Sequence, residues 1–243
     1  MLKTMKADLH IHTCLSPCAD LRMSPQTIAE QAKIKEIDIL GICDHNTAEN
    51  VPALIRAAGR YEISVLPGLE VTSQEEVHIL ALFDRLEPAI ELQGIIYDHL
   101  PGENDEEAFG MQVVVDENGE VLRFNNKLLI GASTLTVNEV VEAIHSLKGL
   151  AVASHVDREG FSLTGQLGFI PPDLNLDALE ISPLTSRQEA LEKFGASYPL
   201  TFSSDAHFPE DIGKSLTSFY ITEASTEEIK KALSNTDGRR IIN

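Results

Sequence analysis

The chain has 243 residues, of which 43% are hydrophobic, and its formal net charge is −19 at pH 7. This length allows one large domain or two small ones with a full hydrophobic core, and a single α/β barrel commonly fills it. The excess of acidic residues argues against a surface that binds long nucleic acid by neutralising its phosphates. A small anionic substrate is still compatible with this charge, because divalent cations bound in one pocket would reverse the electrostatic field there.

The stretch Lys6–Asp20, which reads KADLHIHTCLSPCAD, contains a short apolar run that predicts the first strand. Residues i and i+2 of a strand point to the same face, so the imidazoles of His10 and His12 can reach one point in space. This arrangement presents two nitrogen ligands to one metal ion. Because the His-x-His pattern also occurs on ordinary exposed strands, its meaning depends on the rest of the chain.

The next part of the chain predicts strands that alternate with helices. Ser24 and Pro25 are suited to cap and begin a helix that continues to about Lys35. The elements expected after it are the strand IDILGIC ending at Asp44-His45, a helix over about 48–61, and the strand ISVLPGLEVT with Glu70 near its end. This rhythm predicts βα units around a mostly parallel sheet or barrel, with the active site at the rim where the strands end.

His78 stands at the start of its apolar run, VHILALF, and not at the end. If the chain turns back there as a hairpin, His78 returns to the rim that holds Glu70. A helix is expected over about 88–97, and the following segment, roughly 99–130, breaks the βα rhythm. Within it, MQVVVDENGEVLRF predicts a hairpin closed by Asn118-Gly119. We interpret 99–130 as an insertion over or beside the site.

The βα rhythm resumes after this segment. The expected elements are the helix TVNEVVEAIHSLK, the strand LAVASHV, a loop to Pro172, the strand ALEIS, the helix SRQEALEKFG, the strand PLTFSSDAH, the strand SLTSFYIT and the helix STEEIKKAL. Ser225 and Glu228 have the spacing of a capping box at the start of the last helix. No linker or internal repeat divides the chain, so residues 1–243 are expected to form one domain.

Six of the eight histidines stand beside one another or next to carboxylates at the ends of apolar runs, which predicts a metal centre. The candidate rim residues are His10, His12, Asp20, Asp44, His45, Glu70, His78, His155, Asp205 and His207, with Cys18 nearby. These ligands exceed what one tetrahedral ion needs, so two or three ions with a bridging carboxylate are expected. His99 and His145 lie outside such motifs and are interpreted as ordinary loop and helix residues.

The motifs DLHIHT, CDHN, GLE with VHIL, ASHVD and SSDAH, taken in this order, resemble those of the PHP (polymerase and histidinol phosphatase) family of metal-dependent phosphoesterases. The resemblance implies a distorted (β/α)7 TIM-like barrel with a trinuclear metal site. It implies a first ion held by His10, His12, Glu70 and Asp205. It further implies a second ion held by Glu70, His78 and His155, and a third ion that has His45 and His207 among its ligands.

The third ion needs a further ligand, and the segment SPCAD offers Cys18 or Asp20. We favour Asp20, because oxygen suits a hard ion that binds phosphate, and Cys18 is the alternative if zinc is the physiological metal. Asp44 is expected to orient His45 or another ligand more than to bind metal itself. Cys14 and Cys43 are expected to be small buried residues, since three cysteines fit no disulfide framework.

The resemblance implies hydrolysis of a phosphate ester by a metal-activated hydroxide, without a side-chain nucleophile. Asp205 or His207 could pass a proton to the leaving oxygen, and Arg158 is the candidate for gripping the phosphate with its forked guanidinium. The expected substrate is a small phosphomonoester such as histidinol phosphate or a nucleotide. The alternatives are nucleoside bisphosphates or oligonucleotide ends, and, as a different class, a non-catalytic metal-binding module.

The expected cofactors are two or three divalent ions of zinc, manganese or iron, because imidazole-rich mixed sites accept each of these metals. The N-terminus lacks the apolar region and cleavage site of a signal peptide, and no apolar run approaches the ~20 residues of a membrane span. We therefore expect a cytoplasmic protein with no membrane partner. Long nucleic acid is not expected as a partner, and the sequence leaves the oligomeric state open.

Overall fold

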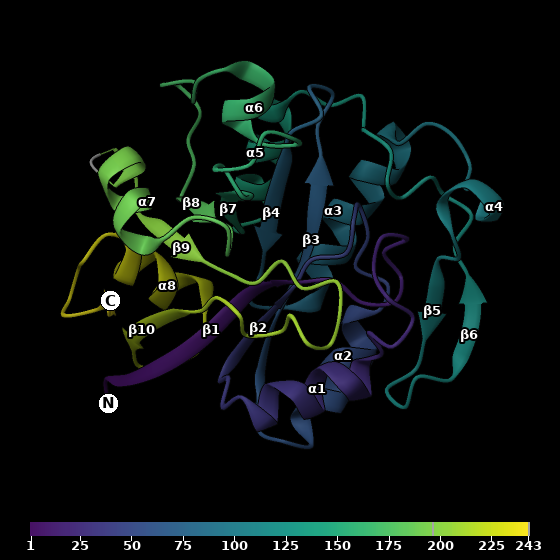
Figure 1. Cartoon of the computed structure of the whole chain (residues 1–243), viewed down its shortest axis with the longest axis horizontal. Coiled ribbons are helices and arrows are strands. Elements are labelled where there is room, and N and C mark those ends of the chain that lie inside the picture. Colours follow the sequence, from purple (N-terminus) through teal and green to yellow (C-terminus); the bar gives the residue numbers. More distant parts are fainter. Residues whose placement is uncertain (196, 243) are drawn as a thin grey trace.

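The computed structural model describes residues 1–195 and 197–242. Over these residues it contains a curled nine-stranded sheet, flanked by helices (Figure 1). In their order across the sheet, the strands are β11 (Arg240–Ile242), β10 (Thr217–Ile221), β1 (Lys3–Ile11), β2 (Ile39–Ile42), β3 (Ser64–Thr72), β4 (His78–Leu82), β7 (Leu150–Ala153), β8 (Ala178–Ile181) and β9 (Leu200–Phe202).

The pairing of the parallel strands brings their carboxyl ends to one rim. Strands β1, β2 and β3 pair in parallel, and so do β7, β8 and β9. Ala206, which follows β9, forms a parallel bridge with Ile11 of β1, so the two ends of this series meet at the rim. The mixed α/β fold is the predicted one. The count of seven βα units stays a prediction, because β4, β10 and β11 pair antiparallel with their neighbours.

The hairpin of β3 and β4 accounts for the unusual position of His78 in its strand. Thr72 lies opposite His78, and Glu70 lies opposite Leu80. The predicted hairpin is therefore confirmed. It returns the first residue of β4 to the rim at which β3 ends, so His78 and Glu70 can face the same pocket.

The helices cover the sheet through one large cluster of buried apolar side chains. They are α1 (Pro25–Ile34), α2 (Val51–Gly59), α3 (Leu86–His99), α4 (Glu106–Phe109), α5 (Val137–Ser146), α6 (Leu163–Leu167), α7 (Arg187–Phe194) and α8 (Thr226–Leu233). The large cluster joins side chains of α1, α2, α3, α5 and α7 to the strands, and a second cluster joins α8 and β10 to them. Within the described residues, no helix combines the length and the apolar character that crossing a bilayer requires.

The starts of the helices follow their sequence signals. Ser24 caps α1 by accepting a hydrogen bond from the backbone of Thr27, and Pro25 occupies its first turn. The capping box predicted for α8 forms only in part. Ser225 accepts from the backbone N–H of Glu228, but the Glu228 carboxylate binds elsewhere, accepting from the backbone of Thr222 and from Arg239.

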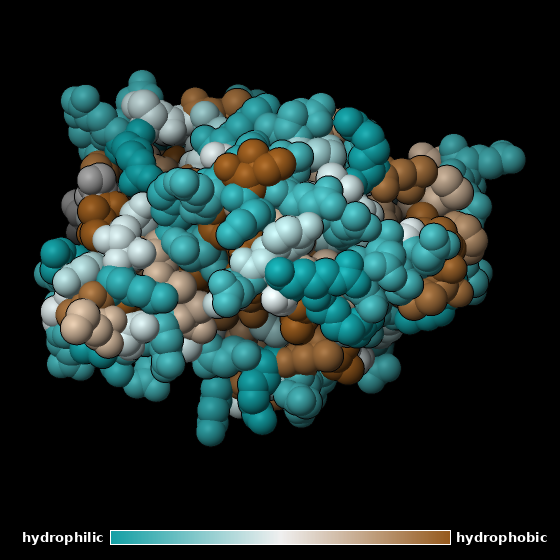
Figure 2. Space-filling model, turned by 90° about the horizontal axis from the view of Figure 1, so that it is seen from below, coloured by the Kyte–Doolittle hydropathy of each residue, from teal (hydrophilic) through white to brown (hydrophobic). Residues whose placement is uncertain are grey.

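The predicted hairpin within 99–130 is present as a separate two-stranded sheet of β5 (Val113–Val115) and β6 (Val121–Phe124). Asn50 attaches it to the main body, because its side chain donates to the carbonyl of Val113 and accepts from the amide of Val115. Figure 2 shows a mostly hydrophilic surface, with hydrophobic atoms gathered on the side of β5 and β6. That this segment is an insertion stays a prediction.

Candidate metal centre

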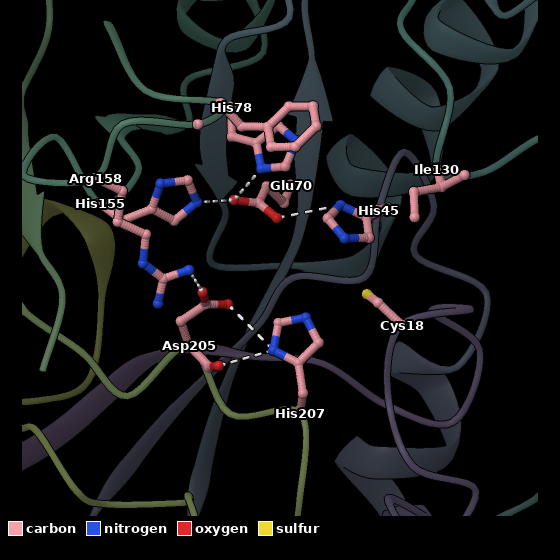
Figure 3. Close-up of a pocket in the computed structure, with 11 residues that line it drawn as sticks. Cys18, His45, Glu70, His78, Ile130, His155, Arg158, Asp205 and His207 are labelled. Carbon is pink, nitrogen blue, oxygen red and sulfur yellow. Dashed lines mark hydrogen bonds and ion pairs between the residues drawn. The ribbon is translucent and has the colours of Figure 1, made fainter. Parts of the chain in front are cut away.

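Most of the predicted rim residues, with the exception of Asp20 and Asp44, gather around one pocket of about 360 Å³ (Figure 3). The pocket is lined by Cys18, His45, Glu70, His78, Ile130, His155, Arg158, Gly160, Phe161, Asp205 and His207. His10 and His12, which are fully buried, adjoin it through their contacts with Glu70 and Asp205. Motifs from both ends of the chain therefore meet at one place. His99 and His145 lie elsewhere and bind Ile95 and Asp177, respectively.

Glu70 lies at the centre of the cluster. Its Oε1 is 3.1 Å from Nδ1 of His78 and 3.3 Å from Nε2 of His155. Its Oε2 is 3.2 Å from Nδ1 of His45. Burial favours the neutral acid, yet His78 and His10 hold the pKa of Glu70 well below its usual range. A charged carboxylate whose two oxygens face different imidazoles is suited to bridge two cations.

His10 and His12 direct two nitrogen atoms at one point. Nδ1 of His10 donates to Glu180, with Oε1 at 3.0 Å, and Nδ1 of His12 donates to Oγ of Ser16 at 2.9 Å. In the neutral imidazoles each Nε2 then carries a lone pair. The two Nε2 atoms are 3.0 Å apart, and each is 3.2 Å from Oδ1 of Asp205. Ligand atoms of one ion, each about 2.0–2.1 Å from it, adopt such separations.

The pKa of His10 indicates that the position between the two imidazoles favours positive charge. Burial of the imidazole opposes its protonation. The surrounding carboxylates of Glu180, Asp205 and Glu70 outweigh burial and raise the pKa of His10 well above its usual value. A proton thus supplies positive charge when no metal ion is bound, and metal binding has to displace it.

Cys18, His45 and His207 form a third group together with His12, and their ligand atoms all lie within 4.8 Å of one another. Burial raises the pKa of the Cys18 thiol, but hydrogen bonding with His207 and His45 outweighs it and lowers the pKa to about 7. Burial likewise opposes protonation of His45, while Cys18 and Glu70 raise its pKa to about 10. The group therefore pairs a readily ionised thiol with cationic imidazoles.

The structure does not bring Asp20 into this cluster. Its carboxylate binds Arg22, with Oδ1 at 3.0 Å from Nε and Oδ2 at 3.1 Å from Nη2. The backbone amide of Asp20 donates to the carbonyl of His207, so this turn approaches the rim through its backbone while the Asp20 side chain points to Arg22. The preference for Asp20 over Cys18 does not fit this geometry, because the turn presents the Cys18 thiol to the pocket instead.

Buried atoms of the cluster lack the partners that buried polar atoms need. Among the described residues, those without a hydrogen bond include Nδ1 of His45, Oε1 of Glu70, Nδ1 of His78, Nδ1 of His155 and Oδ1 of Asp205. An unsatisfied buried polar atom costs about 1–3 kcal/mol. Divalent ions would satisfy these atoms, and a mixture of imidazole, carboxylate and thiol donors suits such ions. The residues present therefore fit a metal centre.

Glu180 is the residue of the site that the sequence prediction missed. It is 1% exposed, accepts a hydrogen bond from Nδ1 of His10 and also accepts from the backbone amide of His155 at 3.2 Å. A carboxylate bound to the outer nitrogen of a metal-binding imidazole fixes its orientation. The available signal was an acidic residue in the middle of the apolar strand ALEIS, since a buried charge needs a specific partner.

Asp44 contacts the site indirectly, through the segment that follows β1. Its carboxylate accepts from the amide of Thr13 at 2.7 Å and from Oγ of Ser16 at 2.7 Å. Ser16 in turn accepts from His12, so Asp44 orients that imidazole through one intermediate hydroxyl. Asp44 lies outside the pocket lining, and its contacts are structural.

Two ligand candidates have backbones in the left-handed region, which side chains other than glycine rarely adopt. His155 has a φ of 29° and Asp205 a φ of 50°. Such conformations cost about 1–3 kcal/mol each and persist where the surroundings enforce them. Asp8 supplies part of that enforcement, because its carboxylate accepts from the amides of Ser204 and Gly213 on either side of Asp205.

Arg158 contacts the cluster through Asp205. Its Nη1 is 2.6 Å from Oδ2 of Asp205, which leaves Oδ1 directed at the two buried imidazoles. Nε of Arg158 has no hydrogen-bond partner among the described residues, and the side chain is 32% exposed. Arg158 therefore positions Asp205, and its side chain lines the pocket.

Comparison with known families decides what this cluster belongs to. The sequence profile of the PHP domain matches residues 8–161, and that of a PHP-associated region matches residues 190–237. The chain belongs to the PHP family. The first match contains the motifs from DLHIHT to ASHVD, and the second contains SSDAH. The resemblance stated from the motifs is therefore confirmed.

Two curated PHP relatives are nucleases by name. The chain is 32% identical over 89 residues to a 5′-3′ exoribonuclease of Haemophilus influenzae, an overlap of 35% of this chain and 31% of the relative. It is also 32% identical over 89 residues to the 5′-3′ exoribonuclease Rnm of Salmonella typhimurium, covering 34% and 29%, respectively. The aligned part thus spans less than a third of each relative.

Solved structures share the PHP fold. The lesion-specific endonuclease Q of Pyrococcus furiosus superposes with a TM-score of 0.74 at 21% identity, covering 98% of this chain and 58% of that one. A putative metal-dependent phosphoesterase from Bifidobacterium adolescentis gives a TM-score of 0.59 at 17% identity, covering 83% and 87%. Identities this low support the fold alone.

Proposed function

We propose that this PHP-family chain is a metal-dependent phosphoric ester hydrolase. The observation that carries the proposal is the position of the Glu70 carboxylate, whose two oxygens face separate sets of imidazoles within 3.1–3.5 Å. Two or three ions of zinc, manganese or iron bound there would activate water and neutralise charge on a phosphoryl group. Such chemistry needs no nucleophilic side chain.

Arg158 and His207 are the proposed substrate-facing residues. The guanidinium of Arg158 lines the pocket, and its forked shape is suited to bind phosphoryl oxygens. Of the two candidates for proton delivery, Asp205 is the poorer one. Although burial favours its protonation, His10 and His12 hold the pKa of Asp205 well below its usual range. The pKa of His207 is raised despite burial, because Cys18 and Asp205 stabilise its charged form.

The proposed substrates are nucleotides and the ends of oligonucleotides. A pocket of about 360 Å³ suits a ligand of nucleotide size. The ring of Phe161, which is 46% exposed, stacks on His78 with centroids 4.8 Å apart and offers a surface for a base.

The names of the relatives support this substrate class over histidinol phosphate. Two of them are 5′-3′ exoribonucleases, and endonuclease Q has been solved with a 27-mer duplex that carries an abasic lesion. These findings conflict with the expectation that long nucleic acid is not a partner. A nucleic-acid end that enters the pocket requires only local neutralisation of phosphate, which bound cations supply despite the acidic surface.

The test compares hydrolysis with metal content. Metal-free protein is reloaded with manganese, zinc or iron(II) and assayed with a chromogenic phosphomonoester, a chromogenic phosphodiester and end-labelled RNA and DNA oligonucleotides. We expect Asp205→Asn and His12→Ala to lose activity by at least ~10³-fold while retaining the circular dichroism of the parent. Bound metal without turnover of any substrate would instead favour the non-catalytic module.

A further inference from the structure

Cys18 has a different environment from the other two cysteines of the chain. The thiols of Cys14 and Cys43 are buried and lie 3.9 Å and 3.5 Å from the backbone carbonyls of Val113 and Leu9, respectively. Cys18 instead lines the pocket, and its sulfur points between His45 and His207 (Figure 3). Asp20, the carboxylate that the sequence favoured as the ligand, follows Cys18 in the same turn, and its side chain is bound to Arg22.

The imidazoles beside Cys18 are oriented as ligands. Nδ1 of His207 donates to the backbone carbonyl of Asp205 at 2.8 Å, which leaves its Nε2 lone pair free. The side chain of His45 is 7% exposed, and its Nδ1 lies 3.2 Å from Oε2 of Glu70, so Nε2 is the nitrogen on the side of Cys18 (Figure 3). The backbone amide of His45 donates to Oγ of Ser16, which fixes the start of this segment. Nε2 of His207 and Nε2 of His45 therefore remain for an ion beside the thiol.

We propose that Cys18 is a thiolate ligand of one ion in the centre and that His45 and His207 complete its protein ligands, with His12 nearby. The inference rests on the metal centre of the proposed function. Two imidazoles and a thiolate form a soft, zinc-like donor set with an open position, whereas His10, Asp205 and Glu70 give the neighbouring positions harder oxygen donors. The ion position that includes Cys18 then retains zinc or iron(II) under conditions in which the other ion positions accept manganese.

This assignment also limits the role of His207. An imidazole whose free nitrogen binds an ion has no proton to deliver from that atom. Because Nδ1 of His207 is occupied by the carbonyl of Asp205, proton delivery to the leaving oxygen passes to solvent when the Cys18 position is filled.

The first test is spectroscopic and independent of hydrolysis. Metal-free protein is titrated with cobalt(II), and near-ultraviolet absorption from sulfur-to-cobalt charge transfer is recorded. We expect the band in the parent protein and in a Cys14→Ala/Cys43→Ala double variant, whose remaining cysteine is Cys18, and its loss in Cys18→Ser. Zinc X-ray absorption of the parent protein should show a sulfur neighbour at about 2.3 Å. This last measurement decides the matter even if a variant fails to fold.

The second test is a metal competition. Protein is equilibrated with equal zinc and manganese, desalted and analysed for metal content. We expect Cys18→Asp to exchange about one zinc equivalent for manganese relative to the parent, because the substitution replaces sulfur with oxygen. Bound metal without a sulfur neighbour, or a band that persists in Cys18→Ser, would overturn the Cys18 assignment and leave the hydrolase proposal standing. Absence of any bound metal would overturn both.

Discussion

Glu180 shows how a residue outside the ligand set can control a metal centre. Its carboxylate holds Nδ1 of His10 at 3.0 Å and the amide of His155 at 3.2 Å, so it orients ligands of two neighbouring positions. We predict that Glu180→Gln lowers metal affinity by about 10–100-fold, because the amide binds the imidazole without the negative charge that increases its basicity. Competition with a chromogenic chelator measures the change.

The control for this substitution is Glu192→Gln. Glu192 is an exposed residue of α7 whose side chain accepts from Gln188, and it has no contact with the pocket. The control should bind metal as the parent does. Equal affinities for the parent and Glu180→Gln would show that this buried carboxylate has no role in tuning the centre.

At the scale of residues, the sequence predicted the members of the cluster that occur in motifs. His10, His12 and Glu70 stand at strand ends, where parallel pairing brings side chains together. The choice between Cys18 and Asp20 was not accessible, since it depends on how one short turn directs two side chains. That turn is set by contacts with His207 from the far end of the chain.

At the scale of elements, the close approach of β1 and β2 aligns the first two ligand motifs. A Cβ placed on Gly41 of β2 would lie 2.3 Å from the carbonyl oxygen of Leu9 in β1. Gly41→Ala therefore has to separate the two backbones. We predict a loss of about 1–3 kcal/mol in the free energy of unfolding, together with weaker metal binding, measured by urea denaturation and metal titration.

Gly59 provides the matched control for Gly41, because a Cβ there meets nothing within 4 Å. Gly59 is the last residue of α2, where alanine is favoured over glycine by up to about 1 kcal/mol. Gly59→Ala should leave stability unchanged or raise it. If Gly41→Ala is as stable as Gly59→Ala, the two strands do not need this close approach.

The junction of α8 with the last strand gives a prediction for pH. Hydrogen bonds from Arg239, and then one from the backbone of Thr222, outweigh burial and lower the pKa of Glu228 from 4.5 to about 2. The folded state therefore favours the charged carboxylate. This contribution to stability is complete above about pH 4.5 and is lost as the pH falls through about 2.

Glu228→Gln should reduce the free energy of unfolding at pH 7 by about 1.5 kcal/mol, the scale of a hydrogen bond to a charged group. The difference from the parent should shrink as the pH is lowered below 4.5, the ordinary pKa of this carboxyl. Urea denaturation of both proteins at several pH values measures it. A difference that stays constant from pH 7 to pH 3 would assign the effect to packing and not to charge.

The elements that the sequence predicted are those with strong local signals. Ser24 with Pro25 marks the start of α1, and Thr136 with Glu139 forms a capping box at the start of α5. The short helices α4 and α6 and the strand β11 were not predicted, and the segment of α4 was interpreted as a polar loop. β11 covers three residues, and its pairing with β10 comes from tertiary contacts that no local pattern encodes.

At the scale of the whole molecule, the alternation of strands and helices was enough to predict a curled α/β fold with its site at one rim. It did not reveal how the rim closes. That closure depends on the bridge between Ile11 and Ala206, which joins segments from opposite ends of the chain. The candidate ligand motifs lie on both sides of this contact, so we expect metal binding and global folding to be coupled.

We therefore predict that metal removal lowers the stability of the whole protein. An ion at about 1,000 times its dissociation constant stabilises the folded state by about 4 kcal/mol, which for a chain of this length is a shift of about 8–16 °C in the unfolding midpoint. Calorimetry with and without chelator measures the shift. Asp205→Asn, which lacks one of the carboxylate charges of the cluster, should show a smaller shift in the unfolding midpoint.

The increase in the unfolding midpoint that metal binding causes should become smaller as the pH is lowered. His10, His45 and His207 have raised pKa values in the metal-free cluster, because neighbouring acidic side chains outweigh burial. Each of these imidazoles must lose a proton before it can bind an ion, so protons compete with the metal more strongly at pH 6 than at pH 8. An equal shift at both pH values would mean that the stabilising ions bind outside this histidine cluster.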